Sequence, residues 1–480
     1  MVVGAGAAGG WAAKELCERG MSVLLLEAGR AIDPARDFPD PPPPQRPVLT
    51  RIRSAVGGQP VQMRSAAFNS RTRRFFVSDR ENPYTTAADA PFNWFRGRQV
   101  GGRMHVWARV ALRLSDEELA GWPLDLNDLE PHYRRAEEFM GVHEAPTTAA
   151  EREIAELVER ALPARRRGPL PMARGEGNPL PAMIRAAEAT GRLTLRPDSV
   201  VRSVTVDEGT ALATGVSFVD RVTREPETAA AARVFLCASA FETLRIMLAS
   251  RSAAHPDGIG NSSGMLGRGV MDHVVTGVGG PHPGSRAEPA EPYSAAGATG
   301  LHFPVDERAF GIQGGIGRGP SWYMLAHGRM ETRPGNRVTL DPDRRDAWGM
   351  PAARVACEHS PADEAMAAEQ QEAMRELADA AGLKVRTPPS GRPLDALAFR
   401  MARRKLVTRS GAFVPGSAIH EVGGAPMGTD PARSVLDPWG RCWDAENVVV
   451  TDGASFPAGC WRNTTLTIIA LTIRACERSG

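Results

Sequence analysis

Lysine is almost absent from this sequence of 480 residues. Among 58 basic residues only Lys14, Lys384 and Lys405 are lysines, and the others are arginines, which we interpret as coding bias rather than function. An excess of charge is absent too, because 56 acidic residues leave a formal net charge of +2. This balance is typical of a globular protein and gives no reason to expect a nucleic-acid partner.

Cysteine motifs and long apolar runs are also missing. The six cysteines form no CxxC pair and no Cys/His spacing of the metal-binding kind, so we expect reduced thiols, a cytoplasmic protein and no bound metal. No stretch of about 18 uninterrupted apolar residues occurs, which argues against a membrane span. The chain also shows no charged and then apolar leader before its first motif, which again favours the cytoplasm.

That first motif is rich in glycine. Gly4-Ala5-Gly6-Ala7-Ala8-Gly9 follows Val2-Val3 and precedes a helical stretch that extends to Arg19. Such a turn needs Gly4 for its backbone angles, Gly6 for the approach of a pyrophosphate, and Gly9 for close packing of helix on strand. The phosphates would then lie at the helix N-terminus, where free N–H groups and the helix dipole favour negative charge.

A second apolar strand, residues 21–26, ends at Glu27. An acid in this place accepts hydrogen bonds from the ribose hydroxyls and disfavours a 2′-phosphate, so the pattern predicts FAD or NAD rather than NADP. The alternative is a glycine turn that serves packing alone. The strand before the turn, the helix after it and the acid together favour the nucleotide.

The chain then leaves this unit and returns to it. Residues 38–50 contain six prolines, which we expect to exclude a helix or a central strand. Residues 196–237 predict a β-meander followed by a buried strand, and helical patterns cover 241–249 and 362–381. A strand at 447–453 and a helix from 463 onward are expected to complete the doubly wound unit that the N-terminal motif begins.

Several stretches, in this order, resemble the glucose/methanol/choline (GMC) flavin oxidoreductases over nearly the whole chain. They are GAGAAGG with Glu27, RGRQVGGRMHVWARVAL at 96–112, WPLDLNDLEPHYRRAEEFMGV at 122–142, NSSGMLGRGVMDH at 261–273, NRVTLDPDRRDAWGMP at 336–351, and HEVGGAPMGTDP with VVVTDGASFPAGCWRNTTLTIIAL from 420 onward. Within the family, the 96–112 stretch is more similar to bacterial sugar and polyol dehydrogenases than to choline or simple-alcohol enzymes.

The resemblance implies an α/β fold with two domains and selects FAD over NAD. One is a discontinuous, Rossmann-like FAD-binding domain, to which we assign residues 1–37, 97–110, 196–275 and 436–480. Residues 38–96 form an excursion or lid. Residues 111–195 and 276–435 form an α+β substrate-binding domain built on an antiparallel sheet.

The resemblance also implies roles for single residues. Gly101 and Gly102 would lie against the flavin, Asp452 and Gly453 would approach its ribityl and phosphate portion, and His420 and Asn463 would face the isoalloxazine. The full set that we predict to bind the cofactor is Gly4, Gly6, Ala7, Ala8, Gly9, Glu27, Gly101, Gly102, Val201, Asp452, Gly453, Asn463 and Thr465.

One departure from the family concerns the attachment of the flavin. Some sugar oxidases of the family bind it covalently through a histidine directly before the tryptophan that matches Trp107. Here Val106 takes that place and His105 lies one residue earlier. We therefore predict non-covalent FAD.

Oxidation of a carbinol needs a base for the hydroxyl proton and a donor that holds the oxygen. We predict that His420, beside the glycine-rich loop 421–424, is the base, that His420 and Asn463 orient the oxygen, and that hydride goes to flavin N5. A structural role for His420 and an N-cap role for Asn463 are the alternatives, and the N-cap is compatible with catalysis. A helix that begins at Asn463 would also stabilise negative charge on the reduced flavin.

Four further side chains are weaker candidates. His105 and Trp107 either line the pocket or pack beside it. We interpret His273 as structural, and Cys460 as a small buried hydrophobe rather than a redox thiol.

The predicted partner is a small alcohol or carbohydrate, and the electron acceptor is left open among oxygen, a quinone and a cytochrome. Two other functions stay open as well. One is a lyase of the same family that uses FAD structurally. The other is a flavoprotein subunit that is active only with a small helper or cytochrome subunit.

Overall fold

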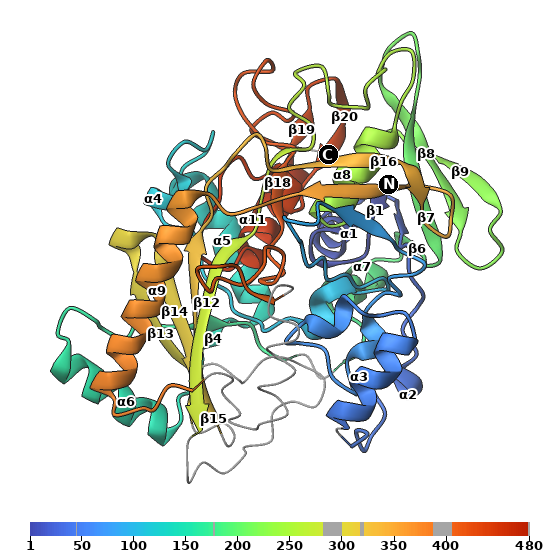
Figure 1. The fold of residues 1–480 in the computed structure, drawn as a ribbon. Helices are drawn as coiled ribbons and strands as arrows, with labels where there is room; N and C mark the ends of the chain where they lie inside the picture. The colour runs from blue at the N-terminus through green and yellow to red at the C-terminus, as the bar shows by residue number, and fades with distance from the viewer. Residues whose placement is uncertain (45, 176–177, 282–299, 317–320, 387–405, 479–480) are drawn as a thin grey trace.

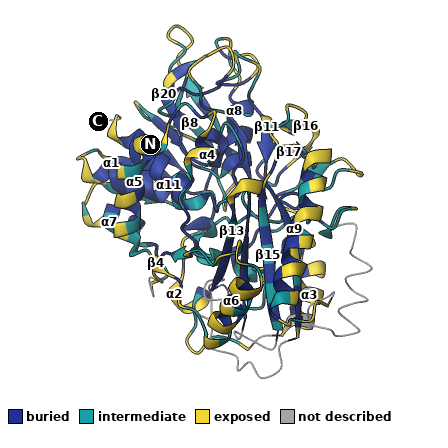
Figure 2. Cartoon of the chain, turned by 90° about the vertical axis from the view of Figure 1, so that its left-hand side faces the viewer, coloured by how far each residue is buried: buried dark blue, intermediate teal, exposed yellow. Residues whose placement is uncertain are grey.

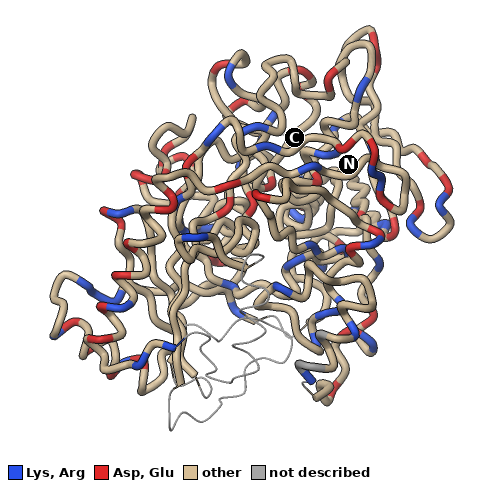
Figure 3. The backbone as a smooth tube through the Cα atoms, in the orientation of Figure 1, with Lys and Arg blue, Asp and Glu red and all other residues tan. Residues whose placement is uncertain are grey.

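The computed structural model describes residues 1–44, 46–175, 178–281, 300–316, 321–386 and 406–478. Within these residues the strands form three larger sheets, of six, five and four strands. The first and last segments of the chain lie side by side in one part of the molecule (Figure 1). Basic and acidic residues intermingle along the backbone (Figure 3).

The six-stranded sheet is parallel except for one edge strand. Its order is β19-β20-β10-β1-β2-β6, and β19 is the antiparallel edge. In the middle, Val2 of β1 pairs with Leu25 on one side and with Phe235 on the other. The strands are β1 Val2–Val3, β2 Val23–Leu26, β6 Leu193–Arg196, β10 Val234–Leu236, β19 Arg441–Cys442 and β20 Ala445–Val450. The first and last segments therefore share one sheet, which confirms the discontinuous Rossmann-like unit.

Helices cover this sheet because their small and apolar residues pack closely. α1 (Ala7–Glu18) packs against α7 (Ala182–Ala189) and α11 (Thr465–Glu477), and α11 packs against α5 (Leu126–Met140). The predicted meander is confirmed as the antiparallel strands β7 (Ser199–Val206), β8 (Ala213–Asp220) and β9 (Pro226–Ala230). β8 packs against β10 and β20, and β10 is the buried strand that follows the meander.

The five-stranded sheet has the order β18-β11-β16-β17-β3. Its strands are β3 Tyr84–Thr86, β11 Arg268–Met271, β16 Arg337–Arg345, β17 Pro351–Ala356 and β18 Val422–Gly424. Helix α8 (Ala240–Ala249) packs on β16, β17 and β18. A single residue, Asp272, separates β11 from the first strand of the next sheet.

The four-stranded antiparallel sheet has the order β12-β15-β14-β13. Its strands are β12 His273–Pro281, β13 Leu301–Val305, β14 Phe310–Gly315 and β15 Ser321–Arg329. Along β15 the buried Trp322, Met324 and Ala326 alternate with half-buried residues, as expected for a strand with two unlike faces. Helices α6 (Ala149–Ala161) and α9 (Pro361–Ala380) pack on the apolar face (Figure 2).

The strand register shows which side chains share the face of the four-stranded sheet that is opposite to α6 and α9. Directly opposed residues of paired strands point to one face, as do residues two apart along a strand. His302 is opposite Gln313, Gln313 is opposite Leu325, and His327 lies two residues beyond Leu325. Arg329 lies two residues beyond His327 and is paired with His273 of β12, so His273 lies on the same face. The sheet therefore presents a polar, histidine-bearing face away from α6 and α9.

The proline-rich segment differs from our expectation, because helix α3 (Pro47–Val56) begins inside it. Proline is tolerated at the first helical position, where its missing N–H would have no partner in the helix anyway. The remaining elements are α2 Pro34–Asp37, η1 Gln62–Arg64, η2 Arg73–Phe75, η3 Gly102–Val106, α4 Asp116–Leu119, β4 His143–Glu144, β5 Pro171–Met172, η4 Asp306–Arg308 and η5 Gly453–Ser455.

Other predicted elements are present. Helices α8 and α9 match the patterns at 241–249 and 362–381, and the Ser360 side chain caps α9 by accepting the N–H of Asp363. In the part of the chain that the structure describes, no helix combines the length and the apolar character needed to cross a membrane.

Candidate active site

The glycine turn after β1 has the local geometry that a pyrophosphate requires. Gly4 has a φ of +97°, and a Cβ there would lie 2.4 Å from the carbonyl oxygen of Cys237. A Cβ on Gly9 would lie 1.7 Å from the carbonyl oxygen of Gly4, so helix α1 and the turn touch at this point. A Cβ on Gly6, by contrast, would meet no protein atom within 4 Å. Two of the glycines therefore serve packing, and the third faces open space.

The N-terminus of α1 opens beside Gly6. Gly6 is the N-cap residue and provides no side-chain cap, and Ala7 and Ala8 are the first residues of the helix. Their backbone N–H groups lie in the part of a helix that has no carbonyl partner within it. This arrangement fits a bound diphosphate, as does the free space at Gly6.

Glu27 ties the turn to the end of β2. One carboxylate oxygen accepts the N–H of Ala5 and the other accepts the N–H of Gly29, each at 2.8 Å. Burial is the largest influence on Glu27 and raises its pKa, while these two hydrogen bonds act in the opposite direction. Each carboxylate oxygen has a second lone pair, which can accept a further hydrogen bond. Glu27 therefore supports the turn, and its predicted contact with the ribose remains compatible with these bonds.

The predicted glycine pair lies across the turn. The N–H of Gly101 donates to the carbonyl of Ala5 at 2.9 Å, and a Cβ on Gly102 would lie 3.2 Å from the Cα of Gly6. Residues 96 positions apart in sequence are thus in contact at the place where the dinucleotide was predicted. The residues present here fit FAD.

Other predicted cofactor residues surround the same sheet edge. Asp452 follows β20, caps η5 through the N–H of Ala454, and accepts a hydrogen bond from the Thr243 hydroxyl at 2.5 Å. Gly453 lies against the carbonyl oxygen of Glu421, 2.8 Å from where its Cβ would be. Burial raises the pKa of Asp452 to about 6.

Val201 and Thr465 have less direct support. Val201 is a buried residue of β7, whose first residue, Ser199, donates its N–H to the carbonyl of Glu27 at 2.8 Å. Thr465 is the first residue of α11. The contact of both residues with the cofactor stays a prediction.

His420 lies among further histidines that the sequence did not connect with it. Its Nδ1 is 3.5 Å from Nδ1 of His273, and its ring centre is 6.3 Å from that of His327. Burial is the largest cause that lowers the pKa of His420, to about 3, and the charge of Arg103 and protonation of His327 act in the same direction. The imidazole is therefore neutral at physiological pH, which is the form that accepts a proton. His273, which we interpreted as structural, is in contact with the predicted base.

These histidines do not form a metal centre. In the described ranges of the chain no group of three or more His, Cys, Asp or Glu side chains is arranged to hold a metal ion. The segment after His420, predicted as a glycine-rich loop, forms strand β18 from residue 422. Gly424 pairs there with Arg268 of β11, and a Cβ on Gly424 would lie 2.4 Å from Leu244.

Asn463 lies beside the polar face of the four-stranded sheet. Its Oδ1 accepts a hydrogen bond from Nε2 of Gln313 at 2.8 Å, and both side chains are buried. The residue is not the N-cap of α11, because Thr464 holds that position and the helix has no side-chain cap. Asn463 instead points its amide toward the sheet. Gln313 and His327 could not be found from the sequence, since no motif marks them.

The weaker candidates have ordinary partners. Nε2 of His105 is 2.7 Å from the carbonyl oxygen of Val100, and its ring stacks on Phe75 with centres 5.1 Å apart. Trp107 ends the short helix η3. Cys460 is buried, its pKa is raised well above the usual range by that burial, and its Sγ bonds to the carbonyl of Arg462. A reactive thiolate is therefore disfavoured at Cys460.

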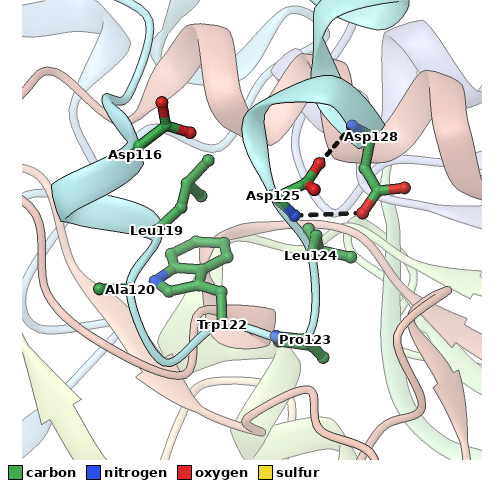
Figure 4. A pocket seen from close by; sticks show the side chains of 8 residues that line it. All are labelled: Asp116, Leu119, Ala120, Trp122, Pro123, Leu124, Asp125 and Asp128. Atoms are coloured by element: carbon green, nitrogen blue, oxygen red, sulfur yellow. Dashed lines mark hydrogen bonds between the residues drawn. The ribbon is translucent and has the colours of Figure 1, made fainter.

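A separate surface hollow of about 570 Å³ lies between α4 and α5 (Figure 4). Asp125 and Asp128 bond there to each other's backbone N–H groups as the capping box of α5. The residues that line it are Asp116, Leu119, Ala120, Trp122, Pro123, Leu124, Asp125 and Asp128. Because none of the predicted site residues is among them, we do not assign the hollow to the active site.

Comparison with known proteins identifies the family of the C-terminal part of the chain. Residues 332–472 match the family model described as GMC oxidoreductase. The 2-methyl-1,2-propanediol dehydrogenase of Mycolicibacterium austroafricanum is 28% identical over 58% of this chain, and the chain spans 53% of that protein. The 6‴-hydroxyparomomycin C oxidase of Streptomyces lividus is 27% identical over 98% of the chain and 89% of that protein. The fructose dehydrogenase large subunit of Gluconobacter japonicus is 24% identical over 99% and 96%.

Solved structures share the fold over the whole chain. Pyridoxine 4-oxidase from Mesorbium loti superposes with a TM-score of 0.68 at 17% identity and covers 99% of this chain and 98% of that one. A formate oxidase of Aspergillus oryzae, studied for FAD modification, has a TM-score of 0.72 at 14% identity and covers 99% and 97%. The Rossmann-like turn, the family match at the C-terminal part and this shared fold lead to one conclusion. Residues 332–472 are of the GMC oxidoreductase family, and the similarity of the whole chain to dehydrogenases and oxidases supports FAD-dependent oxidation of CH–OH groups.

Proposed function

We propose that the protein oxidises a hydroxyl group of a sugar, glycoside or polyol with His420 as general base and FAD bound non-covalently. The observation that carries this proposal is the meeting of neutral His420 and buried Asn463 with one polar face of the four-stranded sheet. Hydroxyl groups need such donors and acceptors around them. The names of two relatives, a fructose dehydrogenase subunit and a hydroxyparomomycin oxidase, support a carbohydrate-like substrate.

His420 accepts the hydroxyl proton in this proposal. Its pKa of about 3 in the protein keeps the ring neutral, and the charge of Arg103 nearby contributes to that shift. Bound FAD supplies the hydride acceptor. A base with so low a pKa is weak in the ground state, so its proton affinity must rise as the alkoxide develops beside it.

Asn463 holds the substrate oxygen. Because its Oδ1 already accepts the hydrogen bond from Gln313, the Nδ2 group is the part of the amide left to donate. An amide N–H directed at the reacting oxygen stabilises negative charge that develops there. In this proposal His420 takes the proton, and Asn463 donates a hydrogen bond to the oxygen.

The experiment is an anaerobic titration of the FAD-loaded protein with sugars, glycosides, polyols and simple alcohols. We expect a sugar-like donor to bleach the flavin band of the wild type and His420→Ala to lose that response. His143→Ala serves as the control, because His143 is an exposed residue of β4. Loss of bleaching in both variants, or in neither, contradicts the role of His420.

The same titration separates the other two functions. The related proteins are dehydrogenases and oxidases, which does not favour a lyase with structural FAD. We propose a small partner subunit as a second possibility, because one relative is the large subunit of its enzyme. FAD that is firmly bound yet never bleached would favour dependence on a partner subunit.

We also propose a cytoplasmic location, because the six cysteines are free and buried.

A further inference from the structure

Each of the two loops that carry His420 and Asn463 is held by a buried carboxylate from a distant part of the chain. Asp272 is the residue between β11 and β12, and Glu118 belongs to α4. They are 1% and 3% exposed. Buried charges of this kind are costly unless they are fully hydrogen-bonded, so their partners indicate what they are for.

The carboxylate of Asp272 accepts three backbone N–H groups from one loop. Oδ2 accepts those of Gly416 at 2.6 Å and Ala418 at 3.2 Å, and Oδ1 accepts that of His420 at 3.2 Å. A carboxylate can do this because its two oxygens offer about four lone-pair sites. The last of the three donors belongs to the predicted base itself.

The loop needs such support because Ile419 is strained. Its φ is +65°, in the left-handed region that β-branched residues rarely adopt. The N–H groups of its neighbours, Ala418 and His420, are two of the groups bound by Asp272. Relaxation of Ile419 to a negative φ would break those bonds and turn the backbone of His420.

Glu118 supports the second loop in the same way. Its Oε1 accepts the N–H of Trp461 at 2.8 Å and of Arg462 at 3.2 Å, and its Oε2 contacts the Arg462 guanidinium. Asn463 is the next residue. Trp461 is packed so closely on β14 that a Cβ on Gly311 would lie 2.1 Å from its ring. The segment before Asn463 is thus held from two sides.

We propose that Asp272 is the positioning residue of the general base. It fixes the backbone on both sides of Ile419 and so directs His420, while Glu118 performs the corresponding task for Asn463. This inference rests on the proposed function, since it assumes that His420 is the base. Neither carboxylate takes part in proton transfer.

The first test is Asp272→Asn in the FAD-loaded protein. Asparagine has the same size, but its NH₂ group would face an N–H group, so at least one of the three bonds is lost. We expect the rate of flavin reduction by an active donor to fall roughly 10- to 100-fold with little change in FAD content, because misplacement of about 1 Å has such an effect. The control is Asp437→Asn, because Asp437 is also buried and accepts the N–H groups of Trp439 and Arg441 in a turn outside the site.

A second readout does not depend on turnover. Amide hydrogen exchange should accelerate at Gly416, Ala418 and His420 in Asp272→Asn and stay unchanged there in Asp437→Asn. Adding Ile419→Gly to Asp272→Asn should restore reduction several-fold, because glycine adopts a φ of +65° without strain. If Asp272 only stabilised the fold, Ile419→Gly would not restore flavin reduction in Asp272→Asn.

The outcomes separate this inference from the proposed function. If no alcohol reduces the wild type, the proposed function is wrong, and unchanged exchange in Asp272→Asn would also overturn the positioning role. If the wild type is reduced and Asp272→Asn reacts equally fast, only the positioning role is wrong. Should Asp272→Asn not fold, Glu118→Gln is measured instead, with slower reduction as the expected result and wild-type rates as the contradiction.

Discussion

Nε2 of Gln313 donates a hydrogen bond to Oδ1 of Asn463 over 2.8 Å, between residues 150 positions apart. The contact joins the inner strand β14 of the four-stranded sheet to the residue that precedes Thr464, the N-cap residue of α11. It therefore links the four-stranded sheet, which comes from the middle of the chain, to the C-terminal segment, which packs with the six-stranded sheet. In the proposed function, it also leaves the Nδ2 end of the Asn463 amide to donate to the substrate.

Gln313→Ala removes that donor. We expect flavin reduction to slow roughly tenfold because the amide loses its fixed orientation. The free energy of unfolding should fall by about 1–3 kcal/mol, because a buried acceptor is left without a partner. Stopped-flow reduction and urea unfolding measure the two effects. Gln371→Ala is the control, since Gln371 donates to the carbonyl of Ser410 from α9, and it should leave reduction unchanged. Equal rates in both variants would contradict the role of Gln313.

Gly6→Ala should separate cofactor binding from folding. A Cβ at Gly6 meets no protein atom within 4 Å, and its φ of −81° suits alanine, so the FAD-free protein should keep its melting temperature. Affinity for FAD should fall, because the methyl group would occupy the approach to the pyrophosphate. Flavin fluorescence titration measures the affinity. Gly335→Ala is the control, since it too has open space and an ordinary φ. Unchanged affinity in Gly6→Ala would place the pyrophosphate elsewhere.

His302 should make the protein sensitive to acid. Burial lowers its pKa to about 4, below its ordinary value of about 6.5. The folded state thus resists protonation that the unfolded state accepts, so stability is full above pH 6.5 and is lost as the pH falls toward 4. For this one group the loss at pH 5 is about 2 kcal/mol.

Urea unfolding at pH 7.5 and pH 5 tests this sign. His302→Gln should lose less stability between the two pH values than the wild type does, and His143→Gln, at an exposed position, should behave as the wild type. Asp272 and Asp452 act in the opposite direction, because burial raises both of their pKa values to about 6. The difference between variant and wild type is therefore the quantity to compare. An equal loss in His302→Gln contradicts the prediction.

The flavin should be released by acid precipitation. Val106 replaces the histidine used for covalent attachment, and Nε2 of the neighbouring His105 is engaged with the carbonyl of Val100 at 2.7 Å. We expect a colourless pellet and free FAD in the supernatant, for the wild type and for His105→Ala alike. A yellow pellet that becomes colourless only in His105→Ala would show a covalent link.

Local patterns in the sequence predicted the nucleotide-binding unit well. The glycine turn, the helix after it, the acid at Glu27 and the meander after residue 196 are each formed by neighbours along the chain. Such elements follow from the spacing of apolar residues and from backbone angles that glycine permits. The same reasoning failed at the proline-rich segment, where Pro47 occupies the one helical position that tolerates proline.

The contacts of the side chains proposed for catalysis could not be predicted in this way. Asp272 holds a loop 144 to 148 positions away, and Gln313 reaches Asn463 from another sheet. No periodicity relates such residues, because their approach depends on how the sheets pack.

The sequence by itself predicted the dinucleotide turn and the resemblance to the GMC family, since these depend on local spacing and on motifs in order, and it indicated the two residues proposed for catalysis. Only the tertiary structure decided that His273 and His327 lie near His420, that Thr464 rather than Asn463 holds the N-cap position of α11, and that buried carboxylates hold both loops. The physical reason is that hydrogen bonds between distant segments form only after the chain has buried its apolar surface and fixed the strand register.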